Sequence, residues 1–349
     1  MEKDLLTVNN LSVEYMQSQS AVKNSSSTMF RAVDGVSFSV KPGEVLGIVG
    51  ESGCGKSSLG LSLLRLIPKK QASLSGDILF RNENILTMSE KRLREIRGRS
   101  ISMILQDLTA LNPVFTIGSQ FAEALRCHGN VPEREIEART IKAMEDVNIS
   151  APRERMASYP HQLSGGMRQR IAGAIAMACE PDLLIADEPT TALDDTVQAK
   201  YLTLLKDIQK KTNVAIIIIT HDFGVVASLC DRLCVMYAGQ IVEKGSVKDI
   251  FNSPSHWYTK GLLSSRPSLS NEVKRLPAIS GMPPDLRKPI AGCRFADRCS
   301  NVQSVCRDDK PQLKSVQVSV NQSSDSNSQL SASLVDEHNV RCFYPAVVI

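Results

Sequence analysis

The feature that most constrains this chain is a glycine-rich stretch at residues 50–57, which reads GESGCGKS. An apolar run at residues 45–49 precedes it, and a helix-like run at residues 58–66 follows it. A strand, a glycine-rich turn and a helix are the context in which the spacing G-x-x-x-x-G-K-S binds phosphate. The glycines let successive backbone N–H groups turn toward an anion, and the helix start adds partial positive charge there. The sequence therefore predicts a phosphate-binding loop.

Side chains in and near this loop point to a nucleotide with magnesium. Lys56 can reach the β- and γ-phosphates, and the Ser57 hydroxyl can bind Mg²⁺. Tyr15 and Phe30 are both candidates to stack on a base, although ordinary packing explains either of them equally well.

Composition limits the class of protein. The chain has 349 residues with 42% hydrophobic and 22% charged residues, which is typical of a soluble globular protein with room for two domains. The net charge of +4 argues neither for nor against nucleic acid. The charged start lacks the apolar core of a signal peptide, and apolar runs such as residues 214–219 are too short to cross a bilayer. We therefore expect a cytoplasmic protein that needs a partner for any membrane role.

Two other apolar runs lead directly into polar residues. Residues 183–186 run into Asp187 and Glu188, and residues 214–219 lead to His221. Runs without alternation are typical of central parallel strands that are covered on both faces. Asp187 is suited to hold Mg²⁺ through water, whereas Glu188 points elsewhere and is the candidate base for the attacking water. A lone histidine is more often a core residue, but the position of His221 right after the strand at residues 214–219 favours a role in closing the γ-phosphate side.

The remaining sequence is typical of an α/β protein. Strand-like runs lie at residues 5–15, 31–40, 76–79, 101–105, 233–237 and 240–243, the last two reading as a hairpin. Helix-like stretches between residues 112 and 160 fit a helical insertion within an α/β domain. The serine-rich stretches at 17–28 and 321–333 read as loops, and the basic run at 92–99 reads as a solvated face.

These motifs resemble those of the ATP-binding-cassette (ABC) ATPases. Over residues 5–255 they follow the family order: the phosphate loop, Gln106, residues 163–166 (LSGG), residues 183–188, residues 192–194 (ALD) and His221. The sequences of residues 159–170 and 293–345 resemble those of the ATPase subunits of importers for di- and oligopeptides and for nickel. Asp195 departs from the family, which usually has an apolar residue there.

The resemblance implies an α/β fold of the P-loop NTPase type. The ABC cassette would have a RecA-like core, an antiparallel β subdomain and a helical subdomain. We expect the cassette at residues 1–255, with the helical subdomain at about 107–165. A small cysteine-rich C-terminal extension would occupy residues 256–349.

The resemblance also assigns roles to residues. It implies that Glu188, His221 and Gln106 are catalytic and that Ser57, Gln106 and Asp187 hold Mg²⁺. The nucleotide contacts that we expect within this chain are Tyr15, Gly50, Glu51, Ser52, Gly53, Cys54, Gly55, Lys56, Ser57 and Ser58. A second anion cradle at Ser164, Gly165 and Gly166 faces the γ-phosphate of another subunit in this family, and the D-loop residues Leu193 and Asp194 lie at that contact.

In this family a chain with one set of motifs carries half of each ATP site, so the resemblance implies that this chain pairs with a second ABC ATPase subunit. An unlike but related chain is favoured over a second copy. The resemblance implies two transmembrane permease subunits and, indirectly, an extracytoplasmic solute-binding protein, with no nucleic acid. We expect the protein to be peripheral, on the cytoplasmic face of the membrane, where ATP closes the dimer and hydrolysis opens it.

Four of the nine cysteines lie near the C-terminus, at Cys293, Cys299, Cys306 and Cys342. In a cytoplasmic chain, clustered cysteines suggest metal binding before disulfides. Their spacing leaves free thiols, disulfides and a zinc site open. The resemblance implies instead a [4Fe–4S] cluster held by the four thiolates.

Two other functions compete with the importer ATPase. One is a soluble ABC-class ATPase that acts on DNA or the ribosome, but such proteins usually carry two cassettes or a long coiled-coil insertion. The other is a regulator that binds ATP without cleaving it, and intact Glu188 and His221 argue against it.

Overall fold

The structure is a computed structural model, and it describes residues 3–16, 29–105, 111–190, 193–265, 278–316 and 338–346. Several predicted features lie outside these residues. They are Gln106, Ala192 of the ALD motif, and the serine-rich stretches at 17–28 and 321–333.

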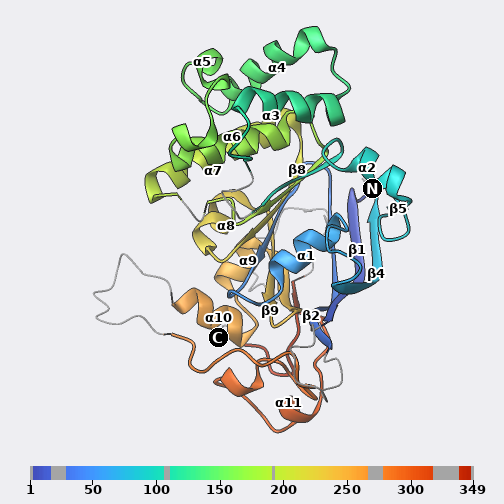
Figure 1. The fold of residues 1–349 in the computed structure, drawn as a ribbon. Coiled ribbons are helices and arrows are strands. Elements are labelled where there is room, and N and C mark those ends of the chain that lie inside the picture. Colours follow the sequence, from blue (N-terminus) through green and yellow to red (C-terminus); the bar gives the residue numbers. More distant parts are fainter. Residues whose placement is uncertain are drawn as a thin grey trace, which may run out of the picture.

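The larger of the two sheets has eight strands in the described part of the chain (Figure 1). In spatial order they are β11 (Lys314–Ser315), β12 (Asn339–Val340), β10 (Gln240–Ser246), β9 (Arg232–Tyr237), β3 (Val45–Val49), β8 (Ala215–Thr220), β7 (Leu183–Asp187) and β6 (Ile101–Ile104). The pairs from β9 to β6 are parallel, and those from β9 to β11 are antiparallel.

The central strands of this sheet are covered on both faces. Every residue of β3, β7 and β8 is buried, as the continuous apolar runs predict. One face packs against α1 and the other against a group of longer helices. The helices next to the sheet are α1 (Lys56–Leu63), α2 (Glu90–Ile96), α6 (Gly165–Met177), α7 (Asp195–Thr212) and α8 (Phe223–Leu229).

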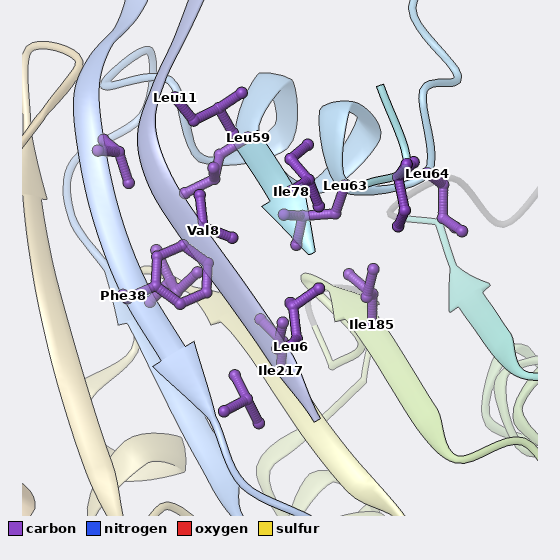
Figure 2. Packing of buried hydrophobic residues seen from close by; sticks show 14 of the residues in the cluster. Leu6, Val8, Leu11, Phe38, Leu59, Leu63, Leu64, Ile78, Ile185 and Ile217 are labelled. Carbon is purple, nitrogen blue, oxygen red and sulfur yellow. The ribbon is translucent and has the colours of Figure 1, made fainter. Parts of the chain in front are cut away.

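The smaller sheet is antiparallel, in the order β2 (Met29–Val40), β1 (Leu6–Met16), β4 (Ala72–Phe80) and β5 (Glu83–Asn84). Helix α1 lies between the two sheets. Figure 2 shows Leu59 and Leu63 of α1 near Val8 of β1 and Ile185 of β7, in one hydrophobic cluster. This core fixes the end of the phosphate loop against both sheets.

A group of short helices follows β6 and lies beyond one end of the larger sheet (Figure 1). It consists of α3 (Ile117–Ala124), the π-helical turn η2 (Leu125–Gly129), α4 (Glu133–Asp146), α5 (Pro152–Met156) and η3 (Pro160–Gln162). Ile117 and Phe121 of α3 pack in the same cluster as Ile171 of α6. The predicted helical insertion is therefore present.

The described residues after β10 contain little regular structure. They include α9 (Val247–Asn252), α10 (Trp257–Ser264), η4 (Ala296–Arg298) and α11 (Val305–Asp308). Strand β12 pairs with β10, where Val340 lies opposite Glu243 and Asn339 opposite Lys244. The C-terminal segment thus adds strands to the sheet that carries the phosphate loop.

Two expectations about local structure need adjustment. Helix α1 begins at Lys56 rather than at residue 58, because Gly55 serves as its N-cap. The basic run at 92–99 is only partly solvated. Arg97 is half-buried, and its guanidinium donates to the carbonyls of Leu64 and Arg65.

In the described residues, no helix has both the length and the apolar character that a membrane crossing requires.

Candidate nucleotide-binding site

The register of the parallel strands brings the predicted motifs together. Val49 at the end of β3 lies beside Thr220 of β8, and Asp187 at the end of β7 lies beside Ile219 of β8. Residues that follow these strands therefore meet at one edge of the sheet. The phosphate loop, the acidic pair and His221 all emerge there.

The phosphate loop requires glycine at several positions. Gly53 and Gly55 have φ values of +79° and +103°, which a side chain makes unfavourable. A Cβ at Gly50 would lie 2.1 Å from the carbonyl oxygen of Met236, and one at Gly55 would lie 2.2 Å from that of Ala32. No described side chain caps α1, so its first N–H groups remain available to an anion.

Lys56 directs its charge into the loop. Its side chain is buried, and its ammonium donates to the carbonyl oxygens of Gly50 (2.7 Å) and Glu51 (3.1 Å). A buried cation held by neutral carbonyls is a strong attractor for phosphate oxygens.

Asp187 has the properties of a magnesium ligand. It is 3% exposed, and its Oδ1 has no hydrogen-bond partner among the described residues. Burial raises the pKa of its carboxyl, a hydrogen bond with Ser57 opposes that shift, and the Glu188 charge adds to it. An unsatisfied carboxylate oxygen beside a serine hydroxyl fits the oxygen donor set that Mg²⁺ prefers. Ser57 and Asp187 are thus suited to hold this ion.

Glu188 and His221 form a pair at the same edge. Both carboxylate oxygens of Glu188 lie 2.9 Å from Nδ1 of His221. The backbone of Glu188 has φ +49°, a costly conformation for a residue with a side chain, and its amide donates to the Ile219 carbonyl at 2.8 Å. The Glu188 side chain is 9% exposed and that of His221 is 56% exposed. The unfavourable backbone conformation of Glu188 therefore sets the direction of a carboxylate that is largely sheltered from solvent.

A cavity of about 400 Å³ lies between the phosphate loop and Glu188, and neither Asp187 nor His221 lines it. Its lining residues are Tyr15, Phe30, Ala32, Ser52, Gly53, Gly55, Lys56, Ser57, Ser58 and Glu188. Of the other loop residues that we expected to contact nucleotide, Gly50, Glu51 and Cys54 do not line this cavity, and Gly50 and Cys54 are buried.

The two aromatic candidates form one wall of this cavity. The rings of Tyr15 and Phe30 stack with centroids 5.4 Å apart and planes 18° apart. The Tyr15 hydroxyl donates to Oγ of Ser58 at 3.1 Å. Both residues lie where a base can stack, although sequence alone could not choose between them.

The second anion cradle lies outside this cavity. Ser164 caps α6 by accepting from the Met167 amide at 3.3 Å, and Asp194 caps α7 by accepting from the Val197 amide at 2.9 Å. The two caps lie side by side, because a Cβ on Gly166 would be 2.9 Å from Val197 and 3.9 Å from Leu193. Residues 164–166 do not line the cavity at the phosphate loop.

The four C-terminal cysteines converge. All four line one cavity of about 10 Å³, which Trp257 and Phe295 also line. Burial raises the pKa values of Cys293 and Cys299 and takes that of Cys342 to about 11. The thiols are free rather than bridged. However, no group of three or more Cys, His, Asp or Glu side chains in the described residues is close enough to hold a metal ion. The iron–sulfur cluster is therefore not supported by this geometry.

Sequence reasoning did not identify two residues that bond to Glu51 of the phosphate loop, Tyr258 and Arg298, or a third, Arg294, that bonds to Ala238 and Asp34. Tyr258, Arg294 and Arg298 all come from the segment after residue 255. One signal was available, since each C-terminal cysteine has an arginine as a chain neighbour.

The fold and the site define a phosphate-loop ATPase, and comparisons with known proteins place it further. The family model for ABC transporters matches residues 33–191, and the model for the oligopeptide/dipeptide transporter C-terminal region matches residues 242–306. The chain is 50% identical over 308 residues to the dipeptide transport ATP-binding protein DppD of Bacillus subtilis (88% of this chain, 89% of that protein). It is also 50% identical over 290 residues to a probable peptide ABC transporter ATP-binding protein, y4tR, of Sinorhizobium fredii (82% and 87%).

Solved structures support the fold. CbiO1 from Clostridium perfringens, part of the ABC transporter complex cbiONQ, matches with a TM-score of 0.57 and 32% identity over 72% of this chain and 92% of that one. The dimeric ATP-binding cassette MJ0796 matches with a TM-score of 0.59 and 24% identity over 69% and 98%. The chain belongs to the ATP-binding subunits of the peptide-importer family of ABC transporters, which couple ATP hydrolysis to transport.

Proposed function

We propose that this chain hydrolyses ATP at the cavity beside residues 50–58 and so drives import of di- or oligopeptides, with nickel as an alternative cargo. One observation carries the proposal. Three groups lie at the same edge of the larger sheet, where the cavity also lies. They are the Lys56 ammonium, the Asp187 carboxylate with its unsatisfied oxygen, and the Glu188–His221 pair. Phosphoryl transfer to water needs this set of charge neutralisation, metal ligation and an aligned base.

Each of these residues has a distinct proposed task. Lys56 binds the phosphates, and Ser57 and Asp187 hold Mg²⁺, which neutralises charge on the phosphate oxygens when bound. Glu188 orients or deprotonates the attacking water. His221, which contacts the carboxylate, closes the γ-phosphate side. Gln106 stays a proposed metal and water contact that lies outside the described residues.

We further propose that two ATPase subunits complete each other's sites. The support is the separation of residues 164–166 from the cavity at the phosphate loop. The cradle at Ser164 and the cap at Asp194 form a single face that can meet the γ-phosphate of a partner. An unlike ATPase chain is the favoured partner, and a second copy is the alternative.

The proposed permease contact lies at the helical group. A groove of about 460 Å³ runs between β6 and α3 and is lined in part by Leu105, Leu111 and Gln120. Close to it in the chain, Val114 and Phe115 are 71% and 51% exposed, and Leu105 is 43% exposed. Exposed apolar side chains in this part of the chain, of which Leu105 lines the groove, suit a segment of a membrane subunit at the cytoplasmic face.

For the extension, which we place at residues 256–349, we propose a metal site at Cys293, Cys299, Cys306 and Cys342. The support is that all four thiols line one cavity and that thiolates are soft ligands. The cavity must widen to admit a [4Fe–4S] cluster. Anaerobically purified protein should show iron, sulfide and visible absorbance. Colourless protein with one zinc per chain would assign zinc instead.

The transport function is tested by its partners. Affinity purification of the tagged chain from detergent-solubilised membranes should recover two integral membrane proteins and a second ATPase. The purified assembly should hydrolyse ATP faster in the presence of a peptide-loaded binding protein. Recovery of ribosomal proteins or nucleic acid in place of membrane subunits would favour the soluble ATPase alternative.

A further inference from the structure

Glu51, inside the phosphate loop, is held by residues of the C-terminal extension. Its carboxylate accepts two hydrogen bonds from the Arg298 guanidinium, at 2.7 and 3.0 Å. Its backbone amide donates to the Tyr258 hydroxyl at 2.9 Å. Its carbonyl is one of the two oxygens that bind the Lys56 ammonium. The extension therefore reaches the residue that also positions the phosphate-binding lysine.

Arg298 is itself rigidly placed. Its side chain is 5% exposed, and its guanidinium carbon lies 5.7 Å from the centroid of the Tyr237 ring. Its Nε donates to the Ser280 carbonyl at 3.1 Å. A sheltered, two-pronged arginine–carboxylate pair is much stronger than an exposed ion pair and fixes the orientation of both partners.

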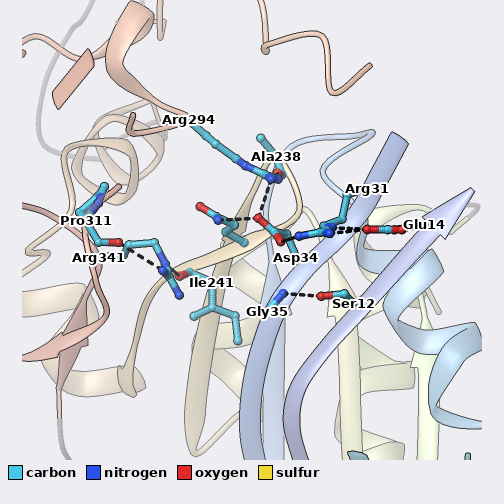
Figure 3. Close-up of polar contacts among 11 residues, drawn as sticks. Ser12, Glu14, Arg31, Asp34, Gly35, Ala238, Ile241, Arg294, Pro311 and Arg341 are labelled. Carbon is cyan, nitrogen blue, oxygen red and sulfur yellow. Dashed lines mark hydrogen bonds and ion pairs between the residues drawn. The ribbon is translucent and has the colours of Figure 1, made fainter. Parts of the chain in front are cut away.

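A second arginine of the extension secures the other side of the loop. Arg294 donates to the carbonyl of Ala238 and to Oδ2 of Asp34 at 2.6 Å (Figure 3). The next residue in the turn, Gly239, donates its amide to the carbonyl of Cys54 at 2.8 Å and accepts from the Asp34 amide at 2.8 Å. Strand β2, which carries Asp34, also carries the cavity residue Phe30.

We propose that Arg298 and Arg294 are positioning residues for ATP, through which the extension sets the affinity of the nucleotide site. The proposal rests on the function proposed above for the cavity at residues 50–58. Arg298 neutralises the Glu51 carboxylate, which would otherwise repel a triphosphate at short range in a partly buried loop. Arg294 holds the turn that bonds to the loop and the strand that carries the aromatic wall.

The charge argument has a distinctive consequence. Removing Arg298 leaves an uncompensated negative charge in the phosphate loop, whereas removing the Glu51 carboxylate leaves an uncompensated positive one. If the pair served only to hold the fold together, breaking it from either side would weaken ATP binding alike. If it sets the charge that ATP meets, the two changes act in opposite directions.

The test is equilibrium binding of MgATP to the full-length chain by calorimetry, with thermal unfolding of each variant recorded. We expect Arg298→Gln to bind MgATP about ten-fold more weakly than the original chain, as loss of a charge-assisted pair implies. We expect Glu51→Gln to bind at least about ten-fold more tightly than Arg298→Gln, and the double variant to lie between them. Arg298→Lys should recover part of the loss, because it restores the charge without the two-pronged geometry.

The matched control is Arg307→Gln. Arg307 also adjoins a cysteine of the extension, but it forms an exposed ion pair with Asp297 at 2.6 Å, in which the two side chains are 57% and 82% exposed. It should bind MgATP like the original chain. Equal weakening by Glu51→Gln and Arg298→Gln, or unchanged binding in Arg298→Gln, would overturn the inference. Failure of the original chain to bind MgATP would instead refute the proposed function of the cavity.

Discussion

The phosphate-loop edge and the C-terminal extension are built in different ways. At the phosphate-loop edge, β3, β7 and β8 are buried along their whole length, and backbone ladders place the residues that follow them. In residues 278–316 and 338–346, each described helix or strand has four residues or fewer. There, hydrogen bonds between side chains hold the segments in place, such as the part-buried pair of Arg298 and Glu51 and the buried pair of His338 and Glu243.

Because of this difference, the two regions should respond differently to substitution of a side chain. A side chain at the end of a rigid strand can be changed without disturbing the ladder that holds it. A side chain that is itself the link cannot be changed without loosening the segment. Changes at the phosphate-loop edge should therefore alter chemistry and leave the fold intact, while changes in the extension should alter local order first.

The largest effect is expected at Glu188. Glu188→Gln should lower the ATPase rate by about 10²–10⁴-fold, because the positioned base is lost while the shape is kept. MgATP binding and the unfolding temperature should stay near those of the original chain. Steady-state hydrolysis and calorimetry measure these quantities. Near-normal turnover in this variant would remove Glu188 from the proposed role.

The extension should respond differently to loss of Glu243. This carboxylate is fully buried and accepts from the amides of Ser255 (2.6 Å) and His256 (2.9 Å), with Nε2 of His338 2.7 Å away. Glu243→Ala strands these groups, at a cost of about 3–5 kcal/mol. Hydrogen exchange should speed up at residues 338–346 and 255–262 before it does in β3 and β8. Glu243→Gln, which keeps an acceptor, is the milder control, and equal exchange across both regions would break the comparison.

The cysteine cavity allows a chemical test of how well the extension is packed. Burial raises the pKa of Cys342 from 9.0 to about 11, so its reactive thiolate is about 100-fold scarcer at neutral pH than an ordinary one. In chelator-treated protein at pH 7.5, exposed Cys127 should be alkylated well before Cys342. The rate at Cys342 should rise about ten-fold per pH unit up to about pH 11. Mass spectrometry of the labelled peptides reads this out, and equal rates at pH 7.5 would contradict the burial.

The smallest effect is expected at the aromatic wall. Tyr15→Ala removes a ring on which a base can stack and should weaken ATP binding by about 1–3 kcal/mol. Tyr15→Phe loses only the 3.1 Å bond to Ser58 and should bind nearly as well as the original chain. Inorganic triphosphate has no base and serves as the control ligand. If Tyr15→Ala binds both ATP and inorganic triphosphate with unchanged affinity, base stacking at this wall is excluded.

Sequence reasoning succeeded where the signal is local. The glycine spacing of the phosphate loop, the buried strands before Asp187 and His221, and the hairpin of β9 and β10 follow from patterns within a few residues. The start of α1 was missed because Gly55 caps it without a side-chain signal. The contact of Arg298 with Glu51 was missed because 247 positions separate the two residues. No periodicity reports a link of that length, and the two-residue strand β12 is too short to leave a pattern.

The pairing of β12 with β10 has a consequence for synthesis. Translation proceeds at roughly 5–20 residues per second, so β10 leaves the ribosome several seconds before residues 339–340 are made. During that interval the outer edge of the nascent sheet has no neighbour and can pair with another chain. Ribosomes that stall or terminate early would release molecules with an intact phosphate loop and a bare sheet edge, and such fragments should aggregate more readily than the finished protein.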